Sequence, residues 1–140
     1  MSITSRELIA VAENARRASY SPYSNFAVGA ALLCADGTVY TGCNIENASF
    51  TPPCCAERVA VFKAVSEGRR DFVAIAIVGG KADESEFGPC YPCGVCRQVL
   101  AEFCAPEMPV LLGGSNGELI TTSVGELLPY TFKLKVEEND

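Results

Sequence analysis

Two groups of cysteines have the residue type and spacing that could hold a metal ion or exchange electrons. Cys93 and Cys96 are separated by two residues, a spacing that lets two thiolates reach one tetrahedral zinc ion. The same pair, between an expected strand and an expected helix, also suits a thiol–disulfide redox site. Cys90 extends it toward an iron–sulfur pattern, but the position of the fourth cysteine in that run is occupied by Leu100.

A third thiol, Cys55, is expected at the start of a different helix. The N-terminus of a helix carries about half a positive charge and therefore stabilises a thiolate. If two helix starts face each other, Cys55, Cys93 and Cys96 supply three thiolates and leave the fourth zinc position open for water, as in catalytic zinc sites. The alternative is a structural site closed by Cys54, although adjacent residues cannot easily point at the same ion.

Two side chains that follow Cys55 are suited to such a site. Glu57 could move protons to and from a water on the metal; the alternative is a surface carboxylate that complements the helix dipole. Three thiolates and Zn²⁺ sum to a charge of −1, which would weaken the metal as a Lewis acid unless something offsets it. We expect Arg58 to do so by donating hydrogen bonds to the sulfurs, instead of lying solvated at the surface.

Length and composition restrict the class of protein further. The 140 residues suit a single domain, residues 1–140, with one hydrophobic core. With 11 Lys and Arg against 17 Asp and Glu, the net charge of −6 lacks the footprint of a general nucleic-acid or anionic-membrane binder, so a small ligand is the expected partner. The absence of histidine excludes mechanisms that need an imidazole.

The hydrophobic segments predict a location in the cytoplasm. The longest apolar run, residues 72–78, is far too short to span a bilayer, and the polar first residues do not read as a secretory signal. We therefore expect the eight cysteines to stay reduced, as buried hydrophobic residues, metal ligands or catalysts, and not to form a disulfide framework.

Periodicity and turn residues predict a layered α/β domain in which one sheet lies between helices and the middle strands are parallel. Asp36-Gly37 suits a two-residue hairpin turn, and Gly68 suits a left-handed helix cap. We expect the acidic end, residues 137–140, to be disordered. The expected elements are a helix over 4–18, strands over 26–35 and 38–44, a helix from 54 or 55 to 67, a strand over 72–78, a loop over 79–88, a helix over 94–104, strands over 110–112 and 118–121, and a short helix capped at 123–126.

Two motifs together match the signature of the zinc-dependent deaminases, Cys-x-Glu followed by Pro-Cys-x-x-Cys. They stand here as Cys55-Ala56-Glu57 and Pro92-Cys93-Gly94-Val95-Cys96. With these motifs the chain resembles the cytidine deaminases, in their small homotetrameric branch. Further matches run through residues 20–26, 28–32, 42–48, 96–100 and 127–129.

The resemblance implies a three-layer α/β/α fold with a mixed five-stranded sheet. It also implies one Zn²⁺ per chain, held by Cys55, Cys93 and Cys96, and a homotetramer whose active sites are shared between subunits. The implied reaction is hydrolytic deamination of cytidine and 2′-deoxycytidine, in which zinc-activated water attacks C4 of the base. Glu57 would protonate N3 and pass a proton to the departing ammonia.

The resemblance assigns substrate contacts as well. Residues matching Asn44 and Glu46 hold the ribose hydroxyls, the backbone amide of Ala56 bonds the base carbonyl, and an aromatic side chain matching Phe26 lines the base pocket. Phe132 aligns with a phenylalanine that enters a neighbouring subunit's pocket. Judged without the resemblance, Asn44 and Glu46 would be read as a polar loop and Phe26 as strand core. A carboxylate at position 46 would repel a 5′-phosphate, which favours nucleosides over nucleotides.

Three rival functions remain at this point. A deaminase of a cytosine-containing antibiotic such as blasticidin S would share the zinc chemistry, but the segment 44–47 suits a ribose. A metal or cluster protein without catalytic activity and a thiol–disulfide exchanger would use the same cysteines differently.

Overall fold

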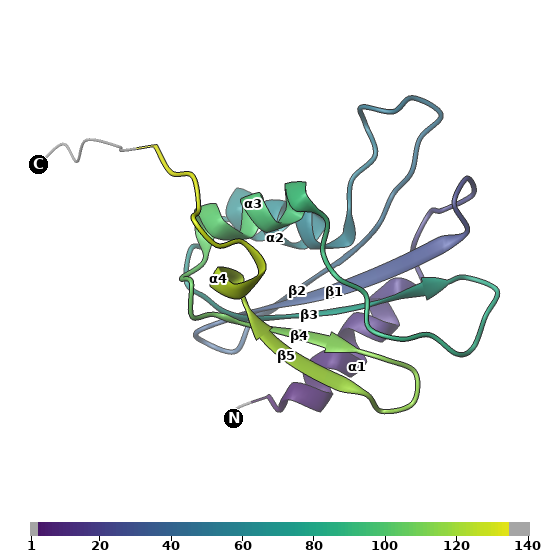
Figure 1. The fold of residues 1–140 in the computed structure, drawn as a ribbon, viewed down its shortest axis with the longest axis horizontal. Helices are drawn as coiled ribbons and strands as arrows, with labels where there is room; N and C mark the ends of the chain where they lie inside the picture. The colour runs from purple at the N-terminus through teal and green to yellow at the C-terminus, as the bar shows by residue number, and fades with distance from the viewer. Residues whose placement is uncertain (1–2, 135–140) are drawn as a thin grey trace, which may run out of the picture.

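A computed structural model describes residues 3–134, and within them helices and strands alternate along most of the chain (Figure 1). In chain order the elements are α1 Ser5–Arg16, β1 Phe26–Cys34, β2 Val39–Cys43, α2 Ala56–Ser66, β3 Phe72–Lys81, α3 Gly94–Phe103, β4 Pro109–Gly113, β5 Leu119–Ser123 and α4 Val124–Leu127.

The strands form one mixed sheet in the order β2-β1-β3-β4-β5. Only the β3–β4 pair is parallel, and the other neighbours are antiparallel. The expectation of parallel middle strands was therefore right for one pair and wrong for β1 and β3. The β1–β2 hairpin explains the difference. The two strands that α2 connects, β2 and β3, do run in the same direction, but β1 lies between them and is antiparallel to both.

The sheet is the middle of three layers, as the resemblance implied (Figure 1). Because side chains alternate along a strand, β1 contributes to two cores. Ala30 and Leu32 pack in the core that contains α2 and α3, whereas Ala31 packs in the core that contains α1. The helices thus cover opposite faces of the sheet.

Two glycines fix how closely the helices approach the sheet. A Cβ at Gly42 in β2 would lie 2.2 Å from the carbonyl oxygen of Ala56, at the start of α2. A Cβ at Gly29 in β1 would lie 2.0 Å from the carbonyl oxygen of Ala12 in α1. Both contacts involve helix backbone, so only glycine lets the helices lie at this depth.

The structure corrects two local predictions. The hairpin loop has three residues, 35–37, because Cys34 and Thr38 still pair through their backbones and only Gly37 has a positive φ, of 93°. The loop expected over 79–88 begins later, since β3 continues to Lys81. Gly79 and Gly80 belong to this strand, where the side chains of Cys90 and Phe87 pack onto them and leave no room for a Cβ.

The other expected boundaries agree closely with the structure. Thr4 and Glu7 form the capping box of α1, Cys55 is the N-cap of α2, and Gly68 has a φ of 88° after that helix. Ser123 is the N-cap of α4, and its hydroxyl accepts a hydrogen bond from the backbone amide of Glu126. The Glu126 carboxylate accepts a second one from the hydroxyl of Thr122. The expectation of disorder at 137–140 lies outside the described residues.

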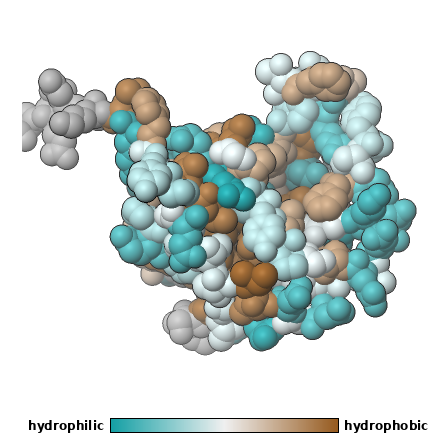
Figure 2. Space-filling model, viewed as in Figure 1, coloured by the Kyte–Doolittle hydropathy of each residue, from teal (hydrophilic) through white to brown (hydrophobic). Residues whose placement is uncertain are grey.

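The loop between β2 and α2 stands away from the body of the molecule (Figure 1), and hydrophobic surface is visible at its tip (Figure 2). Phe50, in this loop, is 98% exposed. Over residues 3–134, no helix is both long and apolar enough to cross a membrane.

The contact at Gly42 leads to a prediction about stability. Gly42→Ala should lower the free energy of unfolding by about 1–3 kcal/mol, because the new methyl group overlaps the backbone of α2. Gly88→Ala is the matched control, since the atom nearest to its added Cβ would be 3.9 Å away. Urea denaturation measures both variants, and equal stability of the two would contradict the packing argument.

Candidate functional site

Three cysteines meet where α2 and α3 begin, at the same end of their layer (Figure 1). Cys55 is the N-cap of α2, Cys93 is the N-cap of α3, and Cys96 lies in the first turn of α3. Their sulfur atoms all lie within 4.8 Å of one another. The Sγ atoms of Cys55 and Cys93 are 3.8 Å apart, and those of Cys93 and Cys96 are 3.5 Å apart.

These sulfur separations fit a tetrahedral zinc ion. With Zn–S bonds of about 2.3 Å, two thiolates on one tetrahedral ion lie roughly 3.8 Å apart. Among the described residues, the group that could hold a metal contains neither Cys54 nor Cys90. The donor set therefore agrees with three thiolate ligands and one position free of protein, and it does not support the closed site that Cys54 would make.

The surroundings of Cys55 favour its thiolate form. A hydrogen bond with Cys96, together with those from Arg58 and Cys93, holds the pKa of Cys55 well below its usual value despite burial. The Nη2 atom of Arg58 donates to the Cys55 sulfur at 3.5 Å, and its Nε atom is buried with no acceptor among the described residues. Arg58 is thus directed at the sulfur cluster, as the charge argument requires.

Glu57 is a buried carboxyl group, only 4% exposed. Burial raises its pKa to about 7, and the negative charge of Cys55 acts in the same direction. A carboxyl group with a pKa near neutrality can both take up and release a proton, which suits general acid–base catalysis. The alternative of a solvated surface carboxylate does not fit this burial.

Asn44 follows β2 and connects it to the start of β1. Its Oδ1 atom accepts hydrogen bonds from the backbone of Val28 at 2.8 Å and from the hydroxyl of Ser19 at 2.5 Å. Its Nδ2 atom donates to the carbonyl of Phe26 at 2.8 Å. An amide nitrogen carries two donors, so these bonds leave one donor of Asn44 for a ligand.

Glu46 is the acceptor for the polar loop that precedes β1. Its Oε1 atom accepts from the backbone amides of Tyr23 at 2.9 Å and Ser24 at 3.1 Å, and its Oε2 atom accepts from the Ser24 hydroxyl. The hydrogen bond from the Ser24 side chain is the main reason why the pKa of Glu46 is lowered. Its carboxylate is therefore charged at neutral pH.

Backbone pairing joins these polar residues to the cysteines. Ile45 and Cys54 exchange two hydrogen bonds, of 2.9 and 3.0 Å, directly before Cys55. On its other side the same segment pairs with Tyr20, which donates to Asn44 and accepts from Glu46. One short segment thus links both predicted ribose contacts to the metal ligands.

The remaining predicted residues occupy different positions. Ala56 is the first residue of α2, so its backbone amide has no partner inside the helix. Phe26 begins β1 and is 38% exposed. Phe132 lies beyond α4 with its ring exposed, and its carbonyl accepts a hydrogen bond from Gln98.

Sequence reasoning missed several residues that shape the site. Ser24 lies in the matched stretch 20–26 and Ser19 just before it, but neither was assigned a role, because their short side chains gave no sign of distant partners. Arg97 anchors the segment before Cys93, because it donates to the carbonyls of Pro92 and Leu127. Its position in the matched stretch 96–100 could have indicated a role, but the fold determines which carbonyls it bonds.

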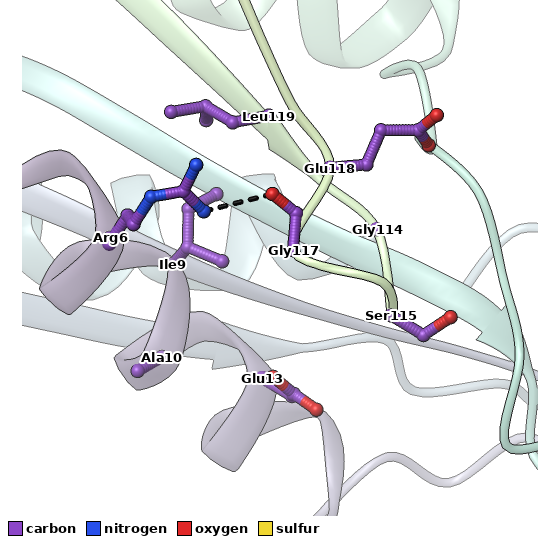
Figure 3. Close-up of a pocket in the computed structure, with 9 residues that line it drawn as sticks. All are labelled: Arg6, Ile9, Ala10, Glu13, Gly114, Ser115, Gly117, Glu118 and Leu119. Carbon is purple, nitrogen blue, oxygen red and sulfur yellow. Dashed lines mark hydrogen bonds between the residues drawn. The ribbon is translucent and has the colours of Figure 1, made fainter.

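A separate hollow of about 270 Å³ lies on the α1 side of the sheet, between α1 and the turn that joins β4 to β5 (Figure 3). Arg6 donates to the carbonyl of Gly117 at its edge, at 2.8 Å. None of the predicted site residues lines it. The chemistry that the sequence predicted therefore belongs to the cysteine end of the opposite layer.

Comparison with known proteins gives consistent matches. Residues 2–112 match the family described as "Cytidine and deoxycytidylate deaminase zinc-binding region". The chain is 54% identical to a cytidine deaminase of Sporosarcina psychrophila, over 90% of this chain and 89% of that protein. It is also 54% identical to one of Halalkalibacterium halodurans, over 89% and 91%. A crystal structure of cytidine deaminase from Burkholderia pseudomallei has a TM-score of 0.86 and 48% identity, and covers 93% of this chain and all of that one.

The ligand geometry predicts which cysteines the metal needs. Cys93→Ala should lose both zinc and activity, because only two of the three clustered sulfurs remain. Cys54→Ala is the matched control and should keep one zinc per chain, since Cys54 lies outside the cluster. Elemental analysis of the purified variants measures this; full zinc in the first variant or none in the second would require a different ligand set.

Proposed function

The chain belongs to the cytidine and deoxycytidylate deaminase family, and on that basis we propose that it hydrolyses cytidine and 2′-deoxycytidine to uridine and 2′-deoxyuridine with release of ammonia. The reaction belongs to pyrimidine salvage. The single observation that carries the proposal is the buried Glu57 beside three thiols at two helix starts. We propose that residues 1–140 form one catalytic domain.

The protein binds one zinc ion per chain, and we propose Cys55, Cys93 and Cys96 as its ligands. The chemistry that zinc supplies when bound is activation of a water molecule as a nucleophile near neutral pH. Arg58 and the N-termini of α2 and α3 offset the negative charge of the sulfurs. They thereby keep the thiolates from weakening the metal as a Lewis acid.

Glu57 is the proposed proton carrier. It takes one proton from the attacking water and gives it to N3 of the base; it then takes the second proton, from the hydroxyl now bonded to C4, and delivers it to the amino group, which leaves as ammonia. Its burial supports this role, because a pKa near 7 lets one carboxyl group serve in both directions. The backbone amide of Ala56, free at the start of α2, is proposed to bond the base carbonyl.

The sugar side of the substrate is proposed to contact Asn44 and Glu46, with Phe26 lining the base pocket. The remaining donor of Asn44 and the charged carboxylate of Glu46 support this assignment. The same charge disfavours a 5′-phosphate nearby, which makes the nucleoside and not the nucleotide the expected substrate.

We propose a homotetramer in which neighbouring chains share active sites and Phe132 enters the pocket of another chain. Contiguous exposed apolar surface, in contrast to single exposed side chains, marks contact surfaces. Phe50 and Phe132 are 98% and 67% exposed. Tyr23, Phe50 and Pro53 also line an apolar hollow beside Glu46.

The eight free thiols support the proposed location in the cytoplasm.

The role of Glu57 can be tested by a change that keeps its shape. Glu57→Gln should keep zinc and uridine binding but lose at least about 10² to 10⁴ in kcat, because the amide cannot transfer the proton. Loss of the cytosine absorbance of cytidine measures the rate, and a zinc chelator should abolish it. The matched control Glu107→Gln, at an exposed carboxylate, should be unchanged. Near-normal turnover of Glu57→Gln would remove this residue from the mechanism.

Shared active sites can be tested by mixing variants. Sedimentation should give a particle of four chains of 14.9 kDa each. Co-expression of Glu57→Gln with Phe132→Ala should yield more activity than either variant alone, because some sites then combine an intact Glu57 with an intact Phe132. Activity no higher than the average of the two parents would contradict a contribution of Phe132 across the interface.

A further inference from the structure

Ser24 contacts two residues of the proposed substrate site, Glu46 and Phe26. Its hydroxyl donates to Oε2 of Glu46, and its backbone amide donates to Oε1 of the same carboxylate at 3.1 Å. The hydroxyl also accepts a hydrogen bond from the backbone amide of Phe26 at 3.0 Å. One serine therefore joins the proposed ribose contact to the residue proposed to line the base pocket.

We propose that Ser24 is a positioning residue, which holds the Glu46 carboxylate in the orientation that receives a ribose hydroxyl. This inference rests on the proposed function, because it takes Glu46 as a sugar contact. Ser24 itself need not touch the nucleoside. Its hydroxyl sets the direction of Glu46 before the substrate arrives.

The acceptor capacity of Glu46 makes this role specific. A carboxylate has about four acceptor positions, two on each oxygen. Oε1 uses two positions for the amides of Tyr23 and Ser24, whereas Oε2 uses one for the Ser24 hydroxyl. The remaining position is on Oε2, so the serine hydroxyl and a ribose hydroxyl would bond the same oxygen side by side.

The backbone around Ser24 has anchors other than Glu46. Asn25 adopts a left-handed conformation with a φ of 58°, and its side chain donates to Asp83 at 2.8 Å. Asn25 also pairs through its backbone with Ser21 and Ala82. Because these contacts hold the loop, the Ser24 hydroxyl can orient the long Glu46 side chain before the nucleoside binds, which lowers the ordering cost of binding.

The expected consequence is a change in binding that depends on the sugar. Ser24 has no hydrogen bond to Glu57 or to the cysteines among the described residues, so the chemical step should be unaffected. A substrate that lacks the 2′- and 3′-hydroxyls has no sugar hydroxyl there to bond Glu46, and its binding should not change when the Ser24 hydroxyl is lost. A purely structural role would instead alter both substrates alike.

The test compares cytidine with 2′,3′-dideoxycytidine in three variants. Ser24→Ala should raise KM for cytidine and the inhibition constant of uridine about tenfold, with kcat within about twofold, because hydrogen bonds to charged groups have this worth. KM for the dideoxynucleoside should stay within about twofold. Ser24→Thr restores the hydroxyl and should recover most of the affinity. Ser21→Ala changes a serine of the same loop whose hydroxyl makes no hydrogen bond within residues 3–134, and it should behave as wild type.

A double variant separates the coupling from other effects. In a Glu46→Ala background, Ser24→Ala should cause little further change, since the partner is gone. Equal effects of Ser24→Ala on both nucleosides, or full additivity with Glu46→Ala, would overturn the positioning role while leaving the deaminase activity standing. A wild-type protein that releases no ammonia from cytidine would instead overturn the proposed function, and this inference with it. Thermal unfolding and zinc content, unchanged in each variant, confirm that the fold is intact.

Discussion

The negative charge that three clustered cysteines would bring to a zinc ion is the constraint on which the rest of this structure depends in the proposed function. As proposed ligands, three thiolates within 4.8 Å of one another would exceed the charge of one Zn²⁺ by one, so further positive charge is needed close by, and the chain has no histidine that could serve as a neutral ligand instead. The N-termini of α2 and α3 and the guanidinium of Arg58 supply that charge. Because β2 and β3 run in the same direction, the two helices that follow them begin at one end of the sheet.

Close packing fixes how near the start of α2 lies to the sheet. Gly42 lets the start of α2 rest against β2, and the pairing of Ile45 with Cys54 ties the preceding loop to it. Polar side chains that bind the sugar in the proposed function also hold this loop together. Asn44 and Glu46 therefore have two roles each, since they stabilise the free protein and keep bonding capacity for a ligand.

The sequence predicted the elements well and their details less well. Capping residues fixed the starts of α1 and α2 because those signals are local. The hairpin loop was predicted one residue too short, since Asp36 does not adopt the positive φ that a two-residue turn needs. Gly79 and Gly80 were placed in a loop because glycine is rare in strands. Their reason, the side chains of Cys90 and Phe87 packed above them, lies in a segment that follows the strand.

By itself, the sequence determined the kind of chemistry. Cys-x-Glu and Pro-Cys-x-x-Cys fix the ligand types and place an acid beside a ligand, because spacing within one helical turn is a local property. The tertiary structure decided the distances: the sulfur of Cys55 lies within 4.8 Å of those of Cys93 and Cys96, and the cluster contains neither Cys54 nor Cys90. It also decided that Ser24 meets Glu46, 22 residues away. Such contacts depend on strand order and helix packing. These are set by many residues across the whole core, so the residues that meet carry no local sequence signal of their contact.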